Sequence, residues 1–126
     1  PMVLGYKTRE KANEVSEMKI IGKVKGKNVI IVDDMVDTAG TLCKAANLIM
    51  EEGARSVRAI VTHGVMSGNA IENVMNSALE QIVFTDSIPF DCSRCSKVKI
   101  LTVSNLFAET ISRVQTNRSI SEQYLM

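Results

Sequence analysis

Long apolar runs are absent from this chain of 126 residues, and so is a strong excess of one charge. No stretch approaches the roughly 20 apolar residues of a membrane span. The start of the chain also lacks the charged region and apolar stretch of a secretory signal. The formal net charge is +1, which gives no reason to expect nucleic acid or an anionic membrane as a partner. We therefore expect the chain to contact neither.

Cysteine and histidine are scarce as well. Three cysteines are a poor basis for a disulfide framework and fit a reducing, cytoplasmic setting. Cys92 and Cys95 form a single C-x-x-C, and Cys43 falls in a predicted helix. Without a second pair, this motif favours a surface loop with incidental thiols over zinc or redox chemistry. We expect His63, the only histidine, to be structural, and we predict no metal site made by the protein alone.

The size of the chain suits one domain with a real core. Hydrophobic residues make up 45% and charged residues 23% of it. The first residue is Pro1, and the segment PMVLGY has strand character without a turn or cap before it. We therefore expect Pro1 to be a cut point within a longer protein, and residues 1–126 to be an incomplete domain.

Strand-like and helix-like patterns alternate along most of the chain. Residues 28–32 form a short, β-branched, continuously apolar run, which predicts a strand buried on both faces. The other predicted strands are 56–62, 81–85 and 98–103, and the predicted helices are 42–50, with Gly53 at its end, 71–79 and 106–114. Such alternation implies parallel strands joined by right-handed crossovers. The sequence therefore predicts an α/β fold, a mostly parallel sheet flanked by helices, with residues 7–19 as an exposed loop.

The stretch IIVDDMVDTAGT, residues 30–41, places three acids where the first of these strands should end. Ligands of parallel sheets bind beyond the carboxyl ends of the strands. Asp33 and Asp34 can accept hydrogen bonds from adjacent sugar hydroxyls. The small residues that follow leave backbone N–H groups uncovered at a helix N-terminus, where the helix dipole favours an anion. These residues are Asp37, Thr38, Ala39, Gly40 and Thr41. The loop is therefore predicted to hold a sugar phosphate.

The alternative is an ordinary turn, because Asp, Thr and Gly are common capping and turn residues. A single D-T-G segment would more often be an ordinary turn than a binding site. The longer pattern D-D-x-x-D-T-x-G-T after two hydrophobic residues is more constrained and favours a site. The segment THGVMSG, residues 62–68, should lie at the next strand end on the same edge of the sheet. Its Ser67 and Gly68 are expected to cap the following helix.

Several segments together resemble one enzyme family. VDDMVDTAGT resembles the phosphoribosyl-diphosphate loop of the type I phosphoribosyltransferases. With KTREKANEVSEMKIIG, THGVMSG and LFAETISRV, it resembles the C-terminal part of the ribose-phosphate diphosphokinase family. The likeness covers nearly the whole chain and departs from the family pattern in the tail SISEQYLM.

This resemblance implies a type I phosphoribosyltransferase fold and an enzyme of nucleotide biosynthesis. The reaction transfers the diphosphoryl group of ATP, with Mg2+, to ribose 5-phosphate, giving phosphoribosyl diphosphate and AMP. By position, Lys7 and Arg9 match the flexible-loop residues that reach the transferring group. Asp33 and Asp34 would hold the ribose hydroxyls, and residues 37–41 would cradle the 5-phosphate. The resemblance also implies a homo-oligomer. We find no adenine pocket in the chain, so we expect the isolated piece to be inactive.

Two other functions share the acid loop. A nucleobase phosphoribosyltransferase should not carry the Lys-x-Arg segment of Lys7 and Arg9. A non-catalytic regulator that binds phosphoribosyl diphosphate should have lost these basic residues. Composition alone would assign both to a solvated charged loop, and it is the family resemblance that favours the catalytic role.

Overall fold

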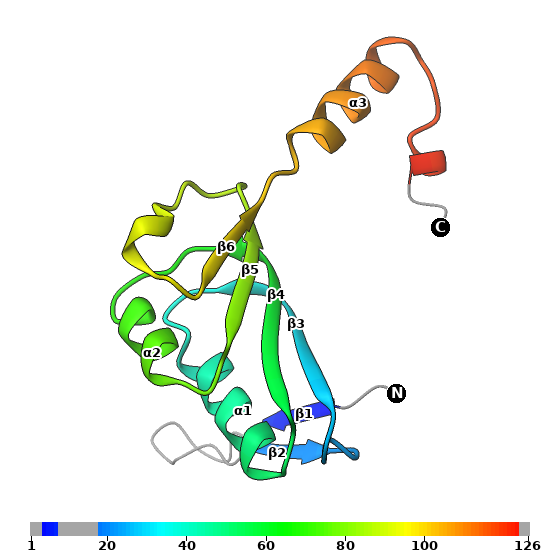
Figure 1. The fold of residues 1–126 in the computed structure, drawn as a ribbon. Helices are drawn as coiled ribbons and strands as arrows, with labels where there is room; N and C mark the ends of the chain where they lie inside the picture. Colours follow the sequence, from blue (N-terminus) through cyan, green and yellow to red (C-terminus); the bar gives the residue numbers. More distant parts are fainter. Residues whose placement is uncertain (1–3, 8–17, 124–126) are drawn as a thin grey trace.

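The chain folds into two sheets of different kinds (Figure 1). The computed structural model describes residues 4–7 and 18–123. The strands are β1 (Leu4–Lys7), β2 (Met18–Ile21), β3 (Asn28–Val36), β4 (Ser56–Gly64), β5 (Gln81–Thr85) and β6 (Val98–Leu101). β1 and β2 form an antiparallel pair, and the other four strands form a parallel sheet in the order β3-β4-β5-β6.

Three helices follow strands of the parallel sheet, as the alternating pattern predicts. They are α1 (Gly40–Glu51), α2 (Ala70–Asn76) and α3 (Ser104–Gln115), with 3-10 turns at Cys92–Arg94 and Ser121–Gln123. The predicted α/β fold with a mostly parallel sheet is confirmed. The loop predicted over residues 7–19 begins and ends in strands instead, because Lys7 pairs with Met18 in the antiparallel sheet. Its central part, residues 8–17, lies outside the described residues.

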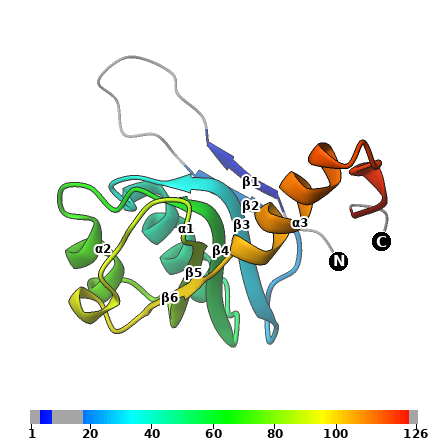
Figure 2. The ribbon, with the colours of Figure 1, turned by 90° about the horizontal axis from the view of Figure 1, so that it is seen from above.

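Among the described residues, helices cover one face of the parallel sheet and leave apolar side chains exposed on the other. α1 and α2 pack beside each other on the same face (Figures 1 and 2). Right-handed crossovers that always step in one direction, from β3 to β4 to β5, place their helices on one side. On the other side Ile30 and Val32 are 57% and 77% exposed, and Ile60 is exposed beside them. The prediction that residues 28–32 are buried on both faces is therefore wrong.

The core lies between this sheet and its two helices. Alternate residues of β4 and β5 point into it, as the pleat of a strand requires. The fully buried ones are Val57, Ala59, Val61, Ile82 and Phe84. Phe90 meets the ring of Phe84 edge-on, with 5.4 Å between centroids. Cys95 is 2% exposed and belongs to the core, so the prediction of a surface thiol is correct for Cys92 and wrong for Cys95.

α1 ends at a glycine, as predicted. Gly53 has a φ of 87°. Its N–H donates to the carbonyl of Met50 at 2.9 Å, and the N–H of Ala54 donates to the carbonyl of Ile49 at 3.2 Å. This pair of bonds is the Schellman motif, which satisfies the last carbonyls of a helix.

The second predicted helix is shorter than its apolar spacing indicates. α2 stops at Asn76 because Ser77 is extended and its hydroxyl donates to the carbonyl of Val74 at 2.8 Å. Leu79 is 1% exposed but lies outside the helix. Met75 is exposed. An apolar residue at helical spacing can therefore be buried without being helical.

α3 forms where it is predicted but does not pack on the sheet. It points away from the parallel sheet (Figure 1), and none of its residues is buried. Its exposed apolar residues are Leu106, Phe107, Ile111 and Val114. No helix within the described residues has the length and apolar character to cross a membrane.

The segment that leads into α3 is held by Asp86, which follows β5. A hydrogen bond from the Thr102 hydroxyl, and another from the N–H of Val103 at 3.0 Å, lower the pKa of the Asp86 carboxyl below its ordinary value. Thr102 and Val103 were predicted to continue a strand over 98–103. β6 instead ends at Leu101, and these two residues bond to Asp86.

We expect Gly64→Ala to destabilise the fold by about 1–3 kcal/mol, the usual cost of overpacking. A Cβ at Gly64 would lie 2.4 Å from two carbons of the Phe84 ring. That ring is 1% exposed and has no room to move. The free energy of unfolding in denaturant measures the effect. Gly40→Ala is the matched control, because a Cβ there meets nothing closer than Thr38 Oγ1 at 3.9 Å. Equal stability of the two variants would contradict the prediction.

We expect the bonds of Asp86 to stabilise the fold only while its carboxyl is ionised. Its pKa is lowered in the folded state. The contribution is therefore complete above the ordinary aspartate pKa of roughly 4 and is lost as the pH falls through the folded value. The difference in unfolding temperature between wild type and Asp86→Ala should be present at pH 7 and vanish in acid. A difference that persists unchanged at low pH would contradict this.

Candidate functional site

The two adjacent acids lie within β3 and not beyond its end. β3 remains paired with β4 as far as Val36 and Gly64, so the strand predicted to stop at residue 32 runs past the acids. Asp33 Oδ1 accepts from the N–H of Asp34 at 2.9 Å. Among the described residues, the Asp34 carboxylate has no hydrogen-bond partner, so both acids are exposed acceptors at this edge.

Residues 37–41 open the N-terminus of α1. Ala39 precedes the helix with a φ of 61°, a left-handed conformation that is uncommon outside glycine, and its own side chain makes no capping hydrogen bond. Gly40 begins the helix and adds no side chain. An uncapped helix start presents backbone N–H groups and favours negative charge. The geometry suits an anion, and phosphate binding at this loop stays a prediction.

The connection between β4 and α2, together with the first turn of α2, holds this loop from one side. The N–H of Ser67 donates to the carbonyl of Asp37 at 3.1 Å. The Ser67 hydroxyl donates to the Asp37 carboxylate. Asn73 Nδ2 donates to the carbonyl of Thr38 at 2.8 Å. The predicted placement of residues 62–68 on the same edge as the acids is therefore confirmed, and the two segments bond directly.

The expectation that Ser67 and Gly68 cap α2 is wrong. The helix begins after Asn69, whose side chain makes no capping bond. The hydroxyl of Ser67 is used by Asp37 instead. The link from Asn73 to Thr38 was missed altogether, because nothing in the local pattern marks a helical asparagine as a partner of a loop 35 residues away.

His63 joins the end of β4 to the residues after β5. Its Nδ1 lies 2.8 Å from Ser87 Oγ. Thr85 Oγ1 lies 2.9 Å from the same oxygen and donates to the carbonyl of Thr62 at 2.7 Å. These contacts suit the structural role expected for this histidine.

Of the two predicted catalytic cations, the structure describes only the backbone of Lys7. Lys7 is the last residue of β1, in the antiparallel sheet. Arg9 lies outside the described residues. Their contact with a transferring diphosphoryl group stays a prediction.

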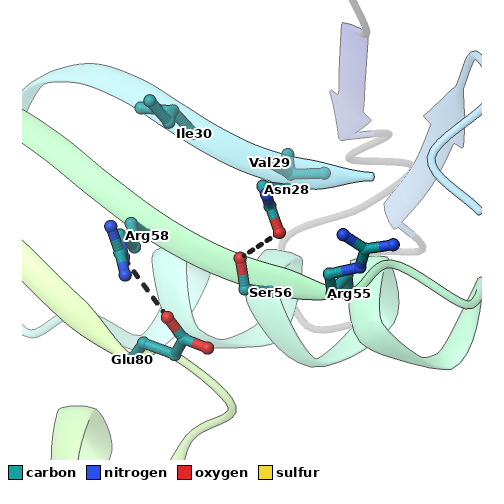
Figure 3. A pocket seen from close by; sticks show the side chains of 7 residues that line it. All are labelled: Asn28, Val29, Ile30, Arg55, Ser56, Arg58 and Glu80. Carbon is teal, nitrogen blue, oxygen red and sulfur yellow. Dashed lines mark hydrogen bonds and ion pairs between the residues drawn. The ribbon is translucent and has the colours of Figure 1, made fainter. Parts of the chain in front are cut away.

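A separate hollow of about 330 Å³ lies at the amino ends of β3 and β4 (Figure 3). Two pairs of its lining groups are already bonded to each other: Ser56 Oγ donates to Asn28 Oδ1 at 2.9 Å, and Arg58 Nε lies 3.2 Å from Glu80 Oε2. It is at the opposite end of these parallel strands from Asp33 and Asp34. Ligands of such sheets bind at the carboxyl ends, so we assign the site to the acid loop.

The family of this chain emerges from comparison with known proteins. The family described as "Phosphoribosyl synthetase-associated domain" matches residues 6–125. The chain belongs to this family. The ribose-phosphate pyrophosphokinase of Porphyromonas gingivalis is 56% identical over 98% of the chain. Ribose-phosphate pyrophosphokinase 3 of Saccharomyces cerevisiae is 50% identical over 92% of it.

A solved structure of the same family has the same fold. The phosphoribosylpyrophosphate synthetase from Mycobacterium smegmatis matches 93% of the chain with a TM-score of 0.83 and 33% identity. The chain spans 37% of that structure's chain, 39% of the P. gingivalis relative and 37% of the S. cerevisiae relative. The predicted family and fold are confirmed, and the assignment to the C-terminal part of such an enzyme stays a prediction.

We expect Gly40→Ala to weaken phosphate binding without lowering stability. The added methyl has room within the protein, and alanine is the better helix former by up to about 1 kcal/mol. The same methyl would stand between an anion and the first backbone N–H groups of α1. Titration calorimetry with inorganic phosphate should show weaker binding, while the unfolding temperature stays equal or rises. Unchanged phosphate affinity would place the anion elsewhere.

Proposed function

We propose that the protein carrying this chain is a ribose-phosphate diphosphokinase. The observation that carries the proposal is the connection from β3 to α1, in which adjacent carboxylates precede an uncapped helix start. The names of the relatives from P. gingivalis and S. cerevisiae support the same reaction. In this reaction the diphosphoryl group of ATP moves to the anomeric hydroxyl of ribose 5-phosphate.

The two halves of the loop suit different parts of one substrate. Carboxylates repel a phosphate, so Asp33 and Asp34 would accept hydrogen bonds from the neutral ribose hydroxyls instead. The backbone N–H groups of residues 37–41 and the hydroxyls of Thr38 and Thr41 would hold the 5-phosphate. Binding at both ends would orient the anomeric hydroxyl away from the loop and towards ATP.

The chemical step is an in-line displacement at the β-phosphorus of ATP. The anomeric oxygen forms a bond to this phosphorus and loses its proton, while the bond from the phosphorus to the bridging oxygen of the α-phosphate breaks and AMP leaves. Negative charge spreads over the transferring group during this step. Lys7 and Arg9 would place positive charge there.

Mg2+ would enter this site together with ATP. Within the described residues, no group of three or more His, Cys, Asp or Glu side chains could hold a metal ion. Mg2+ commonly binds one or two carboxylates together with substrate phosphates. The exposed carboxylates of Asp33 and Asp34 could supply these one or two protein ligands. When bound, the ion would neutralise charge on the phosphates of ATP.

The full-length protein should release AMP from ATP only when ribose 5-phosphate is present. Ribose without the phosphate should be a much poorer acceptor, because the helix start would have no anion to hold. Asp33→Asn should lower kcat/KM by about ten- to a hundredfold, since a hydrogen bond to a charged group contributes roughly 1.5–3 kcal/mol. Coupled detection of AMP, with the product identified by mass spectrometry, measures each effect.

Three results would overturn the proposal. The first is AMP release that does not depend on ribose 5-phosphate, and the second is no AMP release at all. The third is pyrophosphate release from phosphoribosyl diphosphate and a nucleobase, which would identify a nucleobase phosphoribosyltransferase.

A further inference from the structure

Three consecutive backbone carbonyls, those of residues 36–38, point towards one neighbouring segment, residues 65–73. Each accepts a hydrogen bond from it. Val36 accepts from the N–H groups of Val65 and Met66 at 2.9 and 3.2 Å, Asp37 accepts from the N–H of Ser67 at 3.1 Å, and Thr38 accepts from Asn73 Nδ2 at 2.8 Å. Residues 65–73 therefore fix the orientation of three peptide units in a row.

This orientation decides where the adjoining N–H groups point. The C=O and N–H of a trans peptide unit point in opposite directions. The N–H groups of Asp37, Thr38 and Ala39 must then face away from residues 65–73. Within the described part of the chain, none of these three N–H groups donates a hydrogen bond. A run of free N–H groups that ends in a left-handed residue, as Ala39 is with its φ of 61°, forms a concave site for an anion.

We propose that Ser67 and Asn73 are positioning residues that aim these three N–H groups at the 5-phosphate of the substrate, an inference that rests on the proposed function. Neither residue needs to touch the substrate. Asn73 acts through the carbonyl of Thr38, and Ser67 acts through Asp37.

Ser67 has a second effect, on charge. Its hydroxyl donates to the Asp37 carboxylate. This bond holds the negative charge on the side of residues 65–73, opposite the free N–H groups. A phosphate bound at those groups is then farther from the carboxylate, and Coulomb repulsion falls with distance. The bond thus explains how an acid can precede the phosphate-binding residues.

The backbone around Ser67 is itself held in an uncommon shape. Met66 has a φ of 52° although it is not glycine, and its side chain is 6% exposed. Gly68 has a φ of 53°. Left-handed residues of this kind persist where surrounding packing enforces them. The core therefore determines the turn that brings Ser67 to Asp37.

Steady-state kinetics of the full-length protein test the inference. We expect Ser67→Ala and Asn73→Ala each to raise KM for ribose 5-phosphate by about five- to tenfold, the equivalent of one hydrogen bond. The value of kcat should stay within about twofold and KM for ATP should not change, because the phosphate is remote from the reacting bond. A merely structural role would instead lower the unfolding temperature and affect both substrates.

Matched variants control for the substitutions themselves. Asn69→Ala removes an asparagine of the same segment whose side chain makes no capping bond. Ser112→Ala removes an exposed serine of α3. Both should retain wild-type kinetics. Ser67→Thr keeps the hydroxyl and should restore most of the affinity lost in Ser67→Ala.

A double variant tests whether Ser67 acts through Asp37. If it does, Asp37→Ala combined with Ser67→Ala should bind phosphate no more weakly than Asp37→Ala alone. Additive losses would show that Ser67 acts by another route and would overturn its assigned role.

Calorimetry with inorganic phosphate separates this inference from the proposed function. The wild-type protein should bind phosphate, and Ser67→Ala and Asn73→Ala should bind it at least about fivefold more weakly than the two controls. This result would support the positioning role even if no AMP were released in the activity assay. Equal affinity in variants and controls, or no phosphate binding by the wild type, would overturn the inference whatever the enzyme activity.

Discussion

The parallel pairing of β3 with β4 is the constraint on which the rest of the site depends. It runs from Asn28 beside Ser56 to Val36 beside Gly64. Its length brings the connection after β3 and the connection after β4 to the same edge of the sheet. Every bond between these two connections, including those of Ser67 and Asn73, requires this register. A shift of one residue would turn each side chain of a strand to the other face.

The direction of the crossovers explains why the helices cover only one face of the parallel sheet. Each parallel step goes the same way across the sheet, so α1 and α2 cover one face and leave apolar residues such as Ile30 and Val32 exposed on the other. The same arrangement places the carboxyl ends of all four strands on one edge. The connection that carries the acids, His63 and Asp86 lie in or just after these strand ends. The core and the site therefore follow from one topology.

The proposed sugar-phosphate site combines two demands that oppose each other. Carboxylates that can hold a sugar diol repel the phosphate of the same sugar. The connection from β3 to α1 separates them, because Asp33 and Asp34 lie in the strand. The N–H groups that donate no hydrogen bond among the described residues lie beyond it, at Asp37 and the two residues that follow. The third acid, Asp37, is bonded to Ser67. Local backbone direction and one side-chain bond thus allow acids and an anion site in a single loop.

Local patterns in the sequence were sufficient to predict the strand at 81–85, the helix around Leu106 and the glycine that ends α1. The reason is that hydrophobic periodicity and backbone preference act over a few residues. They also indicated an anion loop before Gly40. Only the tertiary structure decided which face of β3 is covered and that Cys95 is buried. It alone joined Ser67 to Asp37 and Asn73 to Thr38, partners that are 30 and 35 residues apart. Such contacts depend on strand register and on the direction of each crossover, which no short stretch of residues specifies.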